Sequence, residues 1–369
     1  MNIGKDMIIE NIADLHFGKT DKDEEMYLSL KNHFIKRCNE VHPDIIIING
    51  DSYDNRQLIN SPANIYFNKF INDCINTGAV IIIFEGTEFH DRHQINALSH
   101  YLSDKFFIIN TVTKLNVLGL KFLIIPEEYV KDDSYYKEYL ADSYDFVQFH
   151  GMFSHVGFAS KITQSDEIVR HQFMFDHKMF ANNVKYYVIG GHIHTHSIYK
   201  NIIYCGSYSR LNFGEEEDKG WIEINVDPKK NKCKWTFMKN PDAPLYTSIL
   251  ASSLPKDMDQ MLIKLREYQE SNNYLRVIID IDDDSMINNI KGFINTHDNC
   301  YSKNERKKKV KEIEEEISDD IIEKQSKLSE RMKTFTGLSF IEITQKMARD
   351  DYNTEFSHEE INQILNTKI

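Results

Sequence analysis

The chain has 369 residues, a length that suits a large folded core with smaller additions rather than one average domain. Its 57 acidic side chains against 44 basic ones give a formal net charge of -13, which argues against a free-standing nucleic-acid binder. No run of about 18 uncharged apolar residues occurs, so the sequence predicts no membrane span. Five scattered cysteines without a CxxC pair, and a start without a signal-peptide core, predict a cytoplasmic protein with reduced thiols.

Strand and helix patterns alternate along the first hundred residues. Apolar runs predict strands at 7–13, 45–49 and 79–84, and amphipathic stretches predict helices at 23–40, 63–77 and 94–102. Continuous apolar strands that alternate with helices indicate a sheet covered by helices on its faces. The pattern becomes antiparallel from residue 113, with a hairpin around Gly119 at 114–118 and 120–125. Further strands are predicted at 145–150, 186–190, 202–207, 221–226 and 232–238. We therefore expect two sheets packed as a sandwich.

The composition changes after residue 240. Asn240-Pro-Asp-Ala-Pro244 is the best candidate for a linker. A helix at 254–270, a strand at 274–281 and a helix at 285–295 predict a small α+β unit, and a charge-dense helical pattern follows from Lys303. The sequence thus predicts a core domain at 1–240, a small second domain at 241–302 and a helical tail at 303–369.

Side chains that bind metals follow the apolar runs. The segments are Asp14-Leu15-His16, Gly50-Asp51, Gly86-Thr-Glu-Phe-His90-Asp91, His150-Gly151 and Gly191-His192-Ile193-His194. The carboxyl ends of adjacent strands meet at one edge of an α/β sheet, so these side chains are expected to lie together. A single His or Asp at a strand end is usually a surface or core residue. The ordered set instead favours a site for two divalent cations.

The spacing within these segments fits shared ligands. Asp14 and His16 lie at positions i and i+2 after a strand, so both side chains point to one side of the chain. The same holds for His192 and His194. Asp51 has two carboxylate oxygens and can bridge two cations about 3.5–4 Å apart.

The order of these residues resembles that of the calcineurin-like metallophosphoesterases, and a second segment narrows the resemblance. Tyr204-Cys-Gly-Ser-Tyr-Ser-Arg-Leu-Asn-Phe-Gly-Glu215, followed by Lys219-Gly-Trp, resembles the Gly-Ser-x-x-Arg-x-x-Phe-Gly-Glu…Lys-Gly segment of the SbcD nuclease family. The resemblance covers residues 7–240 well and the remainder in outline. It implies an α/β fold: a four-layer metallophosphoesterase β-sandwich flanked by helices, with a small α+β capping domain and a helical tail.

The resemblance also implies a role for each residue of the site. The first cation would be held by Asp14, His16, Asp51 and His194, and the second by Asp51, His150 and His192. His90 matches the catalytic histidine of the family, which acts on the leaving oxygen or the scissile phosphate. The implied cofactors are two Mn²⁺ ions, with Mg²⁺ as the replacement.

One segment departs from the family pattern. The family has the sequence Gly-Asn-His-Asp or Gly-Asn-His-Glu at this point, and its Asn is a ligand of the second metal. Here the stretch from Gly86 to Asp91 is two residues longer and has no Asn. Phe89 cannot ligate a metal, Thr87 is a weak candidate, and Glu88 is slightly favoured as the replacement. Two alternatives stay open: a second site without this ligand, completed by water, and a solvent-facing Glu88.

The function expected from the resemblance is metal-dependent hydrolysis of DNA phosphodiester bonds. The protein would be the exonuclease or endonuclease subunit of an SbcC–SbcD-like complex in DNA recombination and repair. Expected partners are DNA, an SbcC-type coiled-coil ATPase bound by the tail, and a second copy of the chain in a homodimer. The expected source is a phage or a bacterium. A phage-encoded protein would be located in the host cytoplasm. The acidic net charge allows this function because bound cations offset several carboxylates.

Two other functions remain open from the sequence. One is a small-molecule phosphoesterase acting on nucleotides, against which the 210–215 segment and the long tail count. The other is a scaffold that binds without cutting, against which the otherwise intact ligand set counts. Arg210 is a candidate for contact with a substrate phosphate and equally a candidate for a structural ion pair.

Overall fold

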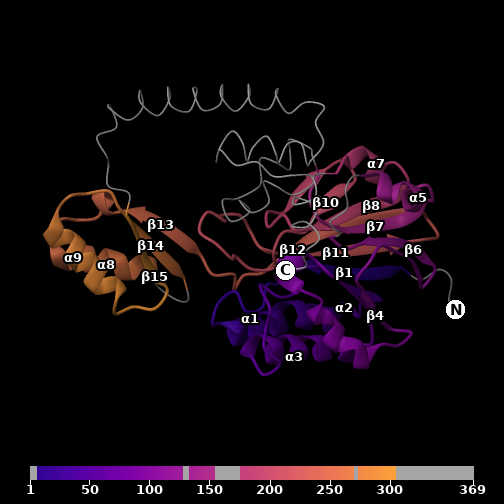
Figure 1. Cartoon of the computed structure of the whole chain (residues 1–369), viewed down its shortest axis with the longest axis horizontal. Helices are drawn as coiled ribbons and strands as arrows, with labels where there is room; N and C mark the ends of the chain where they lie inside the picture. The colour runs from indigo at the N-terminus through magenta and orange to yellow at the C-terminus, as the bar shows by residue number, and fades with distance from the viewer. Residues whose placement is uncertain (1–5, 128–132, 154–174, 270–272, 305–369) are drawn as a thin grey trace, which may run out of the picture. The chain divides into compact units, whose positions relative to one another are not determined.

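The computed structural model describes residues 6–127, 133–153, 175–269 and 273–304. Its larger part is built on two six-stranded sheets (Figure 1). The first sheet has the order β12-β11-β1-β2-β3-β4. Its strands are β1 (Met7–Ala13), β2 (Ile45–Asn49), β3 (Val80–Phe84), β4 (Phe106–Ile109), β11 (Gly220–Asp227) and β12 (Lys232–Lys239). Strands β1 to β4 pair in parallel, and β11 and β12 add an antiparallel edge.

The second sheet has the order β5-β6-β7-β8-β10-β9. Its strands are β5 (Thr113–Val117), β6 (Leu120–Ile125), β7 (Tyr144–His150), β8 (Val184–Gly191), β9 (Ser197–Tyr199) and β10 (Ile202–Tyr204). The four central strands are parallel, while β5 and β9 lie antiparallel at the two edges. The hairpin predicted around Gly119 is present as β5 and β6. The predicted strand at 202–207 ends at Tyr204, and β9 has no counterpart among the sequence predictions.

Helices cover the outer face of each sheet. The first sheet is covered by the α-helices α1 (Asp23–Leu30), α2 (Lys36–Val41) and α3 (Pro62–Asn76), by the π-helix η1 (Lys31–Ile35) and by the 3-10 helix η2 (Gln94–Tyr101). The second carries η3 (Asp133–Tyr136), α5 (Lys137–Leu140) and α7 (His177–Ala181). The start of α3 has a clear local cause, because the Ser61 hydroxyl accepts a hydrogen bond from the backbone N–H of Asn64. Figure 1 shows α1, α2 and α3 on one side of the sheets and α5 and α7 on the other.

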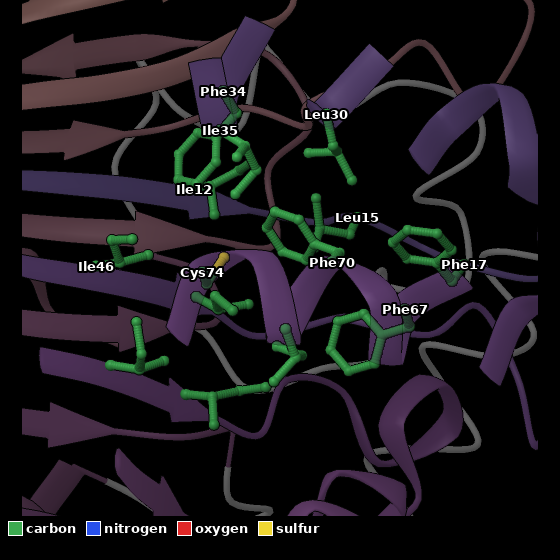
Figure 2. Close-up of a cluster of buried hydrophobic side chains, with 14 of the residues drawn as sticks. Ile12, Leu15, Phe17, Leu30, Phe34, Ile35, Ile46, Phe67, Phe70 and Cys74 are labelled. Carbon is green, nitrogen blue, oxygen red and sulfur yellow. The ribbon is translucent and has the colours of Figure 1, made fainter. Parts of the chain in front are cut away.

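Strand β2 shows how the layers are joined. Ile46 and Ile48 pack against the helices in the cluster drawn in Figure 2, and Ile45 and Ile47 pack against the second sheet. Successive side chains of a strand point to opposite faces, so an all-apolar strand needs a covering layer on both sides. A third cluster, which includes Phe149 of β7, packs the second sheet against its own helices. These contacts confirm the predicted four-layer sandwich flanked by helices.

A smaller unit, in which strands and helices alternate along the chain, follows residue 245. Its sheet has the order β13-β14-β15, and its strands are all parallel. Its elements are β13 (Tyr246–Leu250), η5 (Ala251–Ser253), α8 (Met258–Gln269), β14 (Tyr274–Ile279), α9 (Asp284–Ile294) and β15 (Cys300–Asn304). The sequence predicted both helices and the central strand but neither edge strand. The predicted tail lies outside the described residues from position 305 onward.

In the described part of the chain, no helix combines the length and the apolar character needed to cross a membrane.

Candidate metal centre

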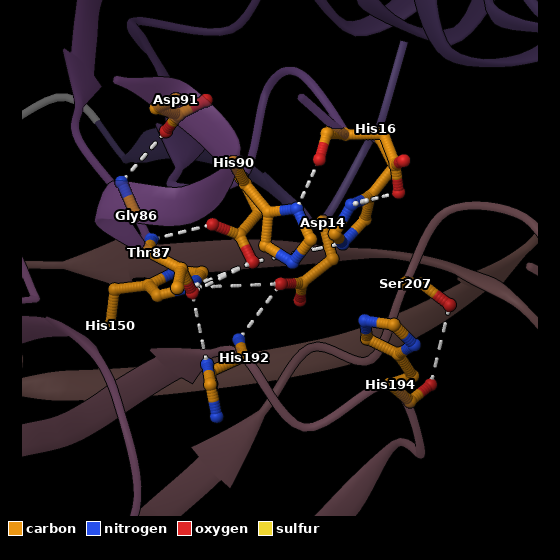
Figure 3. Close-up of polar contacts among 12 residues, drawn as sticks. Asp14, His16, Gly86, Thr87, His90, Asp91, His150, His192, His194 and Ser207 are labelled. Atoms are coloured by element: carbon orange, nitrogen blue, oxygen red, sulfur yellow. Dashed lines mark hydrogen bonds and ion pairs between the residues drawn. The ribbon is translucent and has the colours of Figure 1, made fainter. Parts of the chain in front are cut away.

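The end of β7 and the loops that follow β1, β2, β3 and β8 bring the predicted ligands together (Figure 3). Within the described ranges of the chain, three groups of side chains have their ligand atoms within 4.8 Å of one another. They are Asp14, His16 and His194; His16, Asp51 and His90; and Asp51, His150 and His192. The groups overlap at His16 and Asp51, so they form one continuous cluster with two ends. We call the Asp14–His16–His194 end the first site and the Asp51–His150–His192 end the second site.

Asp51 lies where the two sites meet. Its Oδ2 is 3.7 Å from Nε2 of His16 and 3.3 Å from Nε2 of His150. The backbone N–H of Thr87 donates a 2.6 Å hydrogen bond to the other oxygen, Oδ1. Burial alone would raise the pKa of Asp51, but the neighbouring His150 and His90 hold it well below its usual value. Asp51 is therefore an ionised carboxylate with the position that a bridging ligand needs.

The backbone at the site is strained. Asp14, His16, Asp51 and His192 have positive φ angles of 51°, 50°, 46° and 88°. Residues with a Cβ rarely adopt this region, and such strain concentrates where a binding site requires it. Gly50 adopts φ +69° beside them, and a Cβ there would lie 2.1 Å from Nδ1 of His150. The strand ends are thus bent to bring side chains and backbone close together.

Two histidines of the first site have a carboxylate close to Nδ1 of the ring. Nδ1 of His16 lies 3.4 Å from Oδ1 of Asp54, and Nδ1 of His194 lies 3.1 Å from Oε1 of Glu215. Histidines that hold metals are commonly oriented in this way through the second ring nitrogen. Burial lowers the pKa of His16, which favours the neutral imidazole that a cation requires.

Glu215 and Lys219 give the Gly-Glu…Lys-Gly segment a physical role. Burial acts to raise the pKa of Glu215, but His194 and Lys219 lower it to about 2. The Lys219 ammonium lies 2.6 Å from the Glu215 carboxylate and donates a 2.8 Å hydrogen bond to the carbonyl oxygen of His194. The segment therefore fixes both the ring and the backbone of His194. The sequence analysis quoted this segment without assigning either residue a function.

The histidines of the second site are held differently. Nδ1 of His150 lies 3.1 Å from the carbonyl oxygen of Asn49, so Nδ1 carries the proton and Nε2 faces Asp51. Burial lowers the pKa of His150, but Asp51 outweighs this effect and raises it to about 10. Nδ1 of His192 lies 3.4 Å from Oε2 of Glu127. Burial acts to raise the pKa of Glu127, and the charge of His192 outweighs it, so this pKa is lowered.

Asp91 stabilises the loop from Gly86 to Asp91 through hydrogen bonds to the backbone. Its buried carboxylate accepts hydrogen bonds of 2.7 Å from the N–H of Gly86 and 3.1 Å from the N–H of Tyr53. Burial and the nearby Asp51 raise the pKa of Asp91 to about 7. Nδ1 of His90 is hydrogen-bonded to the carbonyl oxygen of Asp54, which can only accept. Nδ1 therefore carries a proton, and Nε2 is the atom of His90 left for chemistry.

The buried polar atoms of the cluster fit a metal site. Among the described residues, the buried atoms without a hydrogen-bond partner include three that face the cluster: Oδ2 of Asp14 and Nε2 of His16 and His150. Burying polar atoms without partners is costly unless another group satisfies them. Carboxylates and imidazoles together suit divalent cations such as Mn²⁺, Mg²⁺ and Zn²⁺. The donor set and the orphaned atoms thus agree with each other.

Two predicted residues lie apart from the cluster. Glu88 is solvent-exposed at the start of the short helix α4 (Glu88–Asp91), and it belongs to none of the three groups. The Arg210 guanidinium donates hydrogen bonds to the carbonyl oxygens of Ala243, at 3.0 Å, and Glu216, at 3.3 Å. Arg210 thus ties backbone segments together in this structure.

No family model matches the chain, and no curated protein matches it either. One similar solved structure is a novel archaeal phosphodiesterase, with 13% identity, a TM-score of 0.34, and coverage of 63% of this chain and 100% of that one. Another is a predicted phosphoesterase of Streptococcus pneumoniae TIGR4, with 13% identity, a TM-score of 0.29, and coverage of 64% and 91%. Function is inferred from the side chains of the site.

Proposed function

We propose that the protein is a metal-dependent phosphodiesterase that cuts DNA. The observation that carries this proposal is the continuous cluster of buried Asp and His ligands in which Asp51 belongs to both sites. An Asp and His set of this kind, with a carboxylate between two positions, suits a pair of divalent cations. Mn²⁺ is the proposed ion in each site, with Mg²⁺ as the replacement.

Different residues of the chain have different roles in the proposed reaction. When bound, a pair of divalent cations polarises a phosphoryl oxygen and lowers the pKa of a water molecule. Asp51 sets the distance between the two positions because it contacts both His16 and His150. Asp54 and Glu215 keep the rings of His16 and His194 in place, so the first site is formed before a substrate arrives.

His90 is the proposed general acid. Its Nδ1 is fixed by the Asp54 carbonyl oxygen, and its ring lies against that of His16 with a centroid separation of 4.6 Å. Nε2 of the protonated ring is then available to donate a proton to the departing oxygen of the phosphodiester. A positioned acid of this kind contributes about 10²–10⁴-fold to a rate.

The resemblance to the SbcD nucleases supports DNA as the substrate and an SbcC-type ATPase as the partner. A cavity of about 830 Å³ reaches His16 and offers room for more than a phosphate group. Its wall carries five cationic and four acidic side chains: Lys19, Lys22, Arg210, Lys219, Lys239, Asp23, Glu25, Asp218 and Asp242. The tail after residue 303 is the proposed site of ATPase binding, and a homodimer is the proposed assembly. Recombination and repair of DNA is the proposed setting.

Digestion of end-labelled linear duplex DNA with Mn²⁺ tests the substrate. We expect cutting that stops on chelation and is absent in Asp51→Asn. Nucleotides and cyclic nucleotides, offered in parallel, test the small-molecule alternative. Rapid hydrolysis of nucleotides with intact duplex would contradict the DNA assignment while keeping the phosphodiesterase chemistry. Co-purification of the full chain with an SbcC-type ATPase, compared with a chain ending at Asn304, tests the partner.

A further inference from the structure

The second site contains side chains that the family pattern does not include. Thr87 is buried, and its Oγ1 lies 3.2 Å from Oδ2 of Asp51 and 3.4 Å from Nδ1 of His192. The same hydroxyl donates a 2.9 Å hydrogen bond to Oε2 of Glu127. One hydroxyl therefore touches two predicted ligands and a carboxylate from a distant part of the chain, as Figure 3 shows for Thr87 and His192.

Glu127 reaches this place from the second sheet. It lies two residues beyond the end of β6, and its side chain is 9% exposed. Oε2 of Glu127 is 3.4 Å from Nδ1 of His192, and within the described residues this histidine is its ion-pair partner. A buried carboxylate is costly unless it is paired or binds a metal. A histidine that is itself a metal ligand in its neutral form leaves that carboxylate without a counter-charge unless a cation is present.

The separations match those within a coordination shell. Two atoms that each lie about 2.1 Å from one ion are about 3.0 Å apart at a right angle and about 3.4 Å apart in a tetrahedron. Oε2 of Glu127 is 3.4 Å from Nδ1 of His192. Nε2 of His150 is 3.3 Å from Oδ2 of Asp51. Each of these two pairs is spaced as neighbouring ligands of one cation, and the Thr87 hydroxyl lies between the pairs. Glu127 is outside the three groups of the cluster and reaches the second site through Thr87 and His192.

Glu88 cannot share this position in the present geometry. Thr87 directs its hydroxyl inward, and the helical turn that begins at Glu88 leaves the next carboxylate exposed. The two candidate acids are thus separated by burial, with Glu127 inside the site and Glu88 in solvent.

We propose that Glu127 is a ligand of the second cation and replaces the asparagine that the Gly86–Asp91 loop lacks. The inference rests on the proposed function, because it names a ligand of the same two-cation site. Thr87 lies beside this ligand and holds its carboxylate through the Oγ1 hydrogen bond. The second site then has two carboxylates, from Asp51 and Glu127, and two imidazoles. An added carboxylate favours hard cations such as Mn²⁺ and Mg²⁺.

Three single variants separate this ligand from its neighbours. Glu127→Ala removes the carboxylate, Glu127→Gln keeps its shape and an amide oxygen, and Glu88→Ala is the matched control outside the site. Mn²⁺ is titrated into each chelator-treated protein by calorimetry. We expect two ions in the wild type and in Glu88→Ala, with equal affinities. We expect Glu127→Ala to bind the second ion at least about 100-fold more weakly with the first unchanged, and Glu127→Gln to fall between them.

A crystal structure of the wild type with Mn²⁺ distinguishes a ligand from a carboxylate that only orients His192. The proposal requires a Glu127 oxygen within about 2.0–2.3 Å of the second ion. A separation above about 3 Å, or two ions bound normally by Glu127→Ala, overturns the role of Glu127 alone. A wild-type protein that binds fewer than two ions contradicts the two-cation site itself, and the proposed function with it.

Discussion

The two ends of the metal cluster are built in different ways. At the first site every ligand follows a strand end in a recognisable motif, and Asp54 and Glu215 stand behind the two histidines. At the second site the loop after β3 differs from the family pattern and lacks its asparagine. Thr87 and Glu127 lie beside the remaining ligands there. Both sites combine residues from the two sheets, but the first uses only residues that directly follow the strand ends, whereas the second includes the altered loop and a residue after β6.

This difference shows which parts of a site tolerate change. A ligand pair such as Asp14 and His16 needs one strand and one bend, so altering it destroys the site. A ligand supplied from an adjacent loop can be exchanged for another from a different sheet, provided the new group reaches the same point. The predictions that follow test this contrast, from the largest expected effect to the smallest.

Replacing the residue shared by both sites should have the largest effect. Asp51→Asn keeps the size of the side chain but removes the charge that faces His16 and His150. We expect it to lose most Mn²⁺ binding at both sites and at least about 10⁴-fold in hydrolysis, with the fold intact. Calorimetry and circular dichroism measure these outcomes. Two ions bound at wild-type affinity would show that the sites do not share Asp51.

Replacing His90 should separate chemistry from metal binding. His90→Ala removes the proposed proton donor but none of the proposed ligands of either site. We expect both Mn²⁺ ions to remain and the rate on a phosphodiester to fall about 10²–10⁴-fold. Metal content and steady-state kinetics on the same preparation provide the comparison. Loss of an ion in this variant would make His90 a ligand and extend the first site.

Removing an orienting carboxylate should weaken the first site alone. Asp54→Asn keeps the size of the side chain but removes the charge 3.4 Å from Nδ1 of His16. We expect the first ion to bind about 10–100-fold more weakly and the second to be unaffected. Asp142→Asn, in an exposed ion pair with Lys114, is the matched control. Equal weakening of both ions would contradict the independence of the two sites.

Glu10 of β1 provides the contrast of a buried carboxylate that lies outside the cluster. Burial and the nearby Glu223 raise its pKa from 4.5 to about 8, although the Trp221 indole N–H donates a 2.8 Å hydrogen bond to it. The unfolded chain therefore releases this proton at lower pH than the folded one. The free energy of unfolding should fall between pH 4.5 and 8, by at most a few kcal/mol. Denaturation of Glu10→Gln should show a flatter profile, and an unchanged one would contradict this assignment.

Much of the fold followed from the sequence, because buried strands of isoleucine such as β2 leave few alternatives. The positions of Asp14, Asp51, His150 and His194 also follow from one rule, that parallel strands end at a common edge. Short edge strands such as β9 were missed since three residues carry no readable period.

Glu127 had a signal that the sequence analysis did not use. It follows the apolar run at 120–125 directly after Pro126, so the rule applied to the other strand ends marks it as well. The replacement ligand was instead sought inside the altered loop, at Glu88, because the family's own ligand comes from there. Asp54 and Glu215 carried no such signal, since their roles depend on rings brought near them by folding.

The most direct test of the account is the dependence of hydrolysis on the number of bound ions. Mn²⁺ is added stepwise to chelator-treated wild-type protein while hydrolysis of bis-p-nitrophenyl phosphate is followed. We predict no hydrolysis without metal and a rate that rises only as the second ion binds, because both ends of the cluster are needed. A protein that hydrolyses the ester fully in excess chelator, or that stays inactive with both sites filled, would contradict the account.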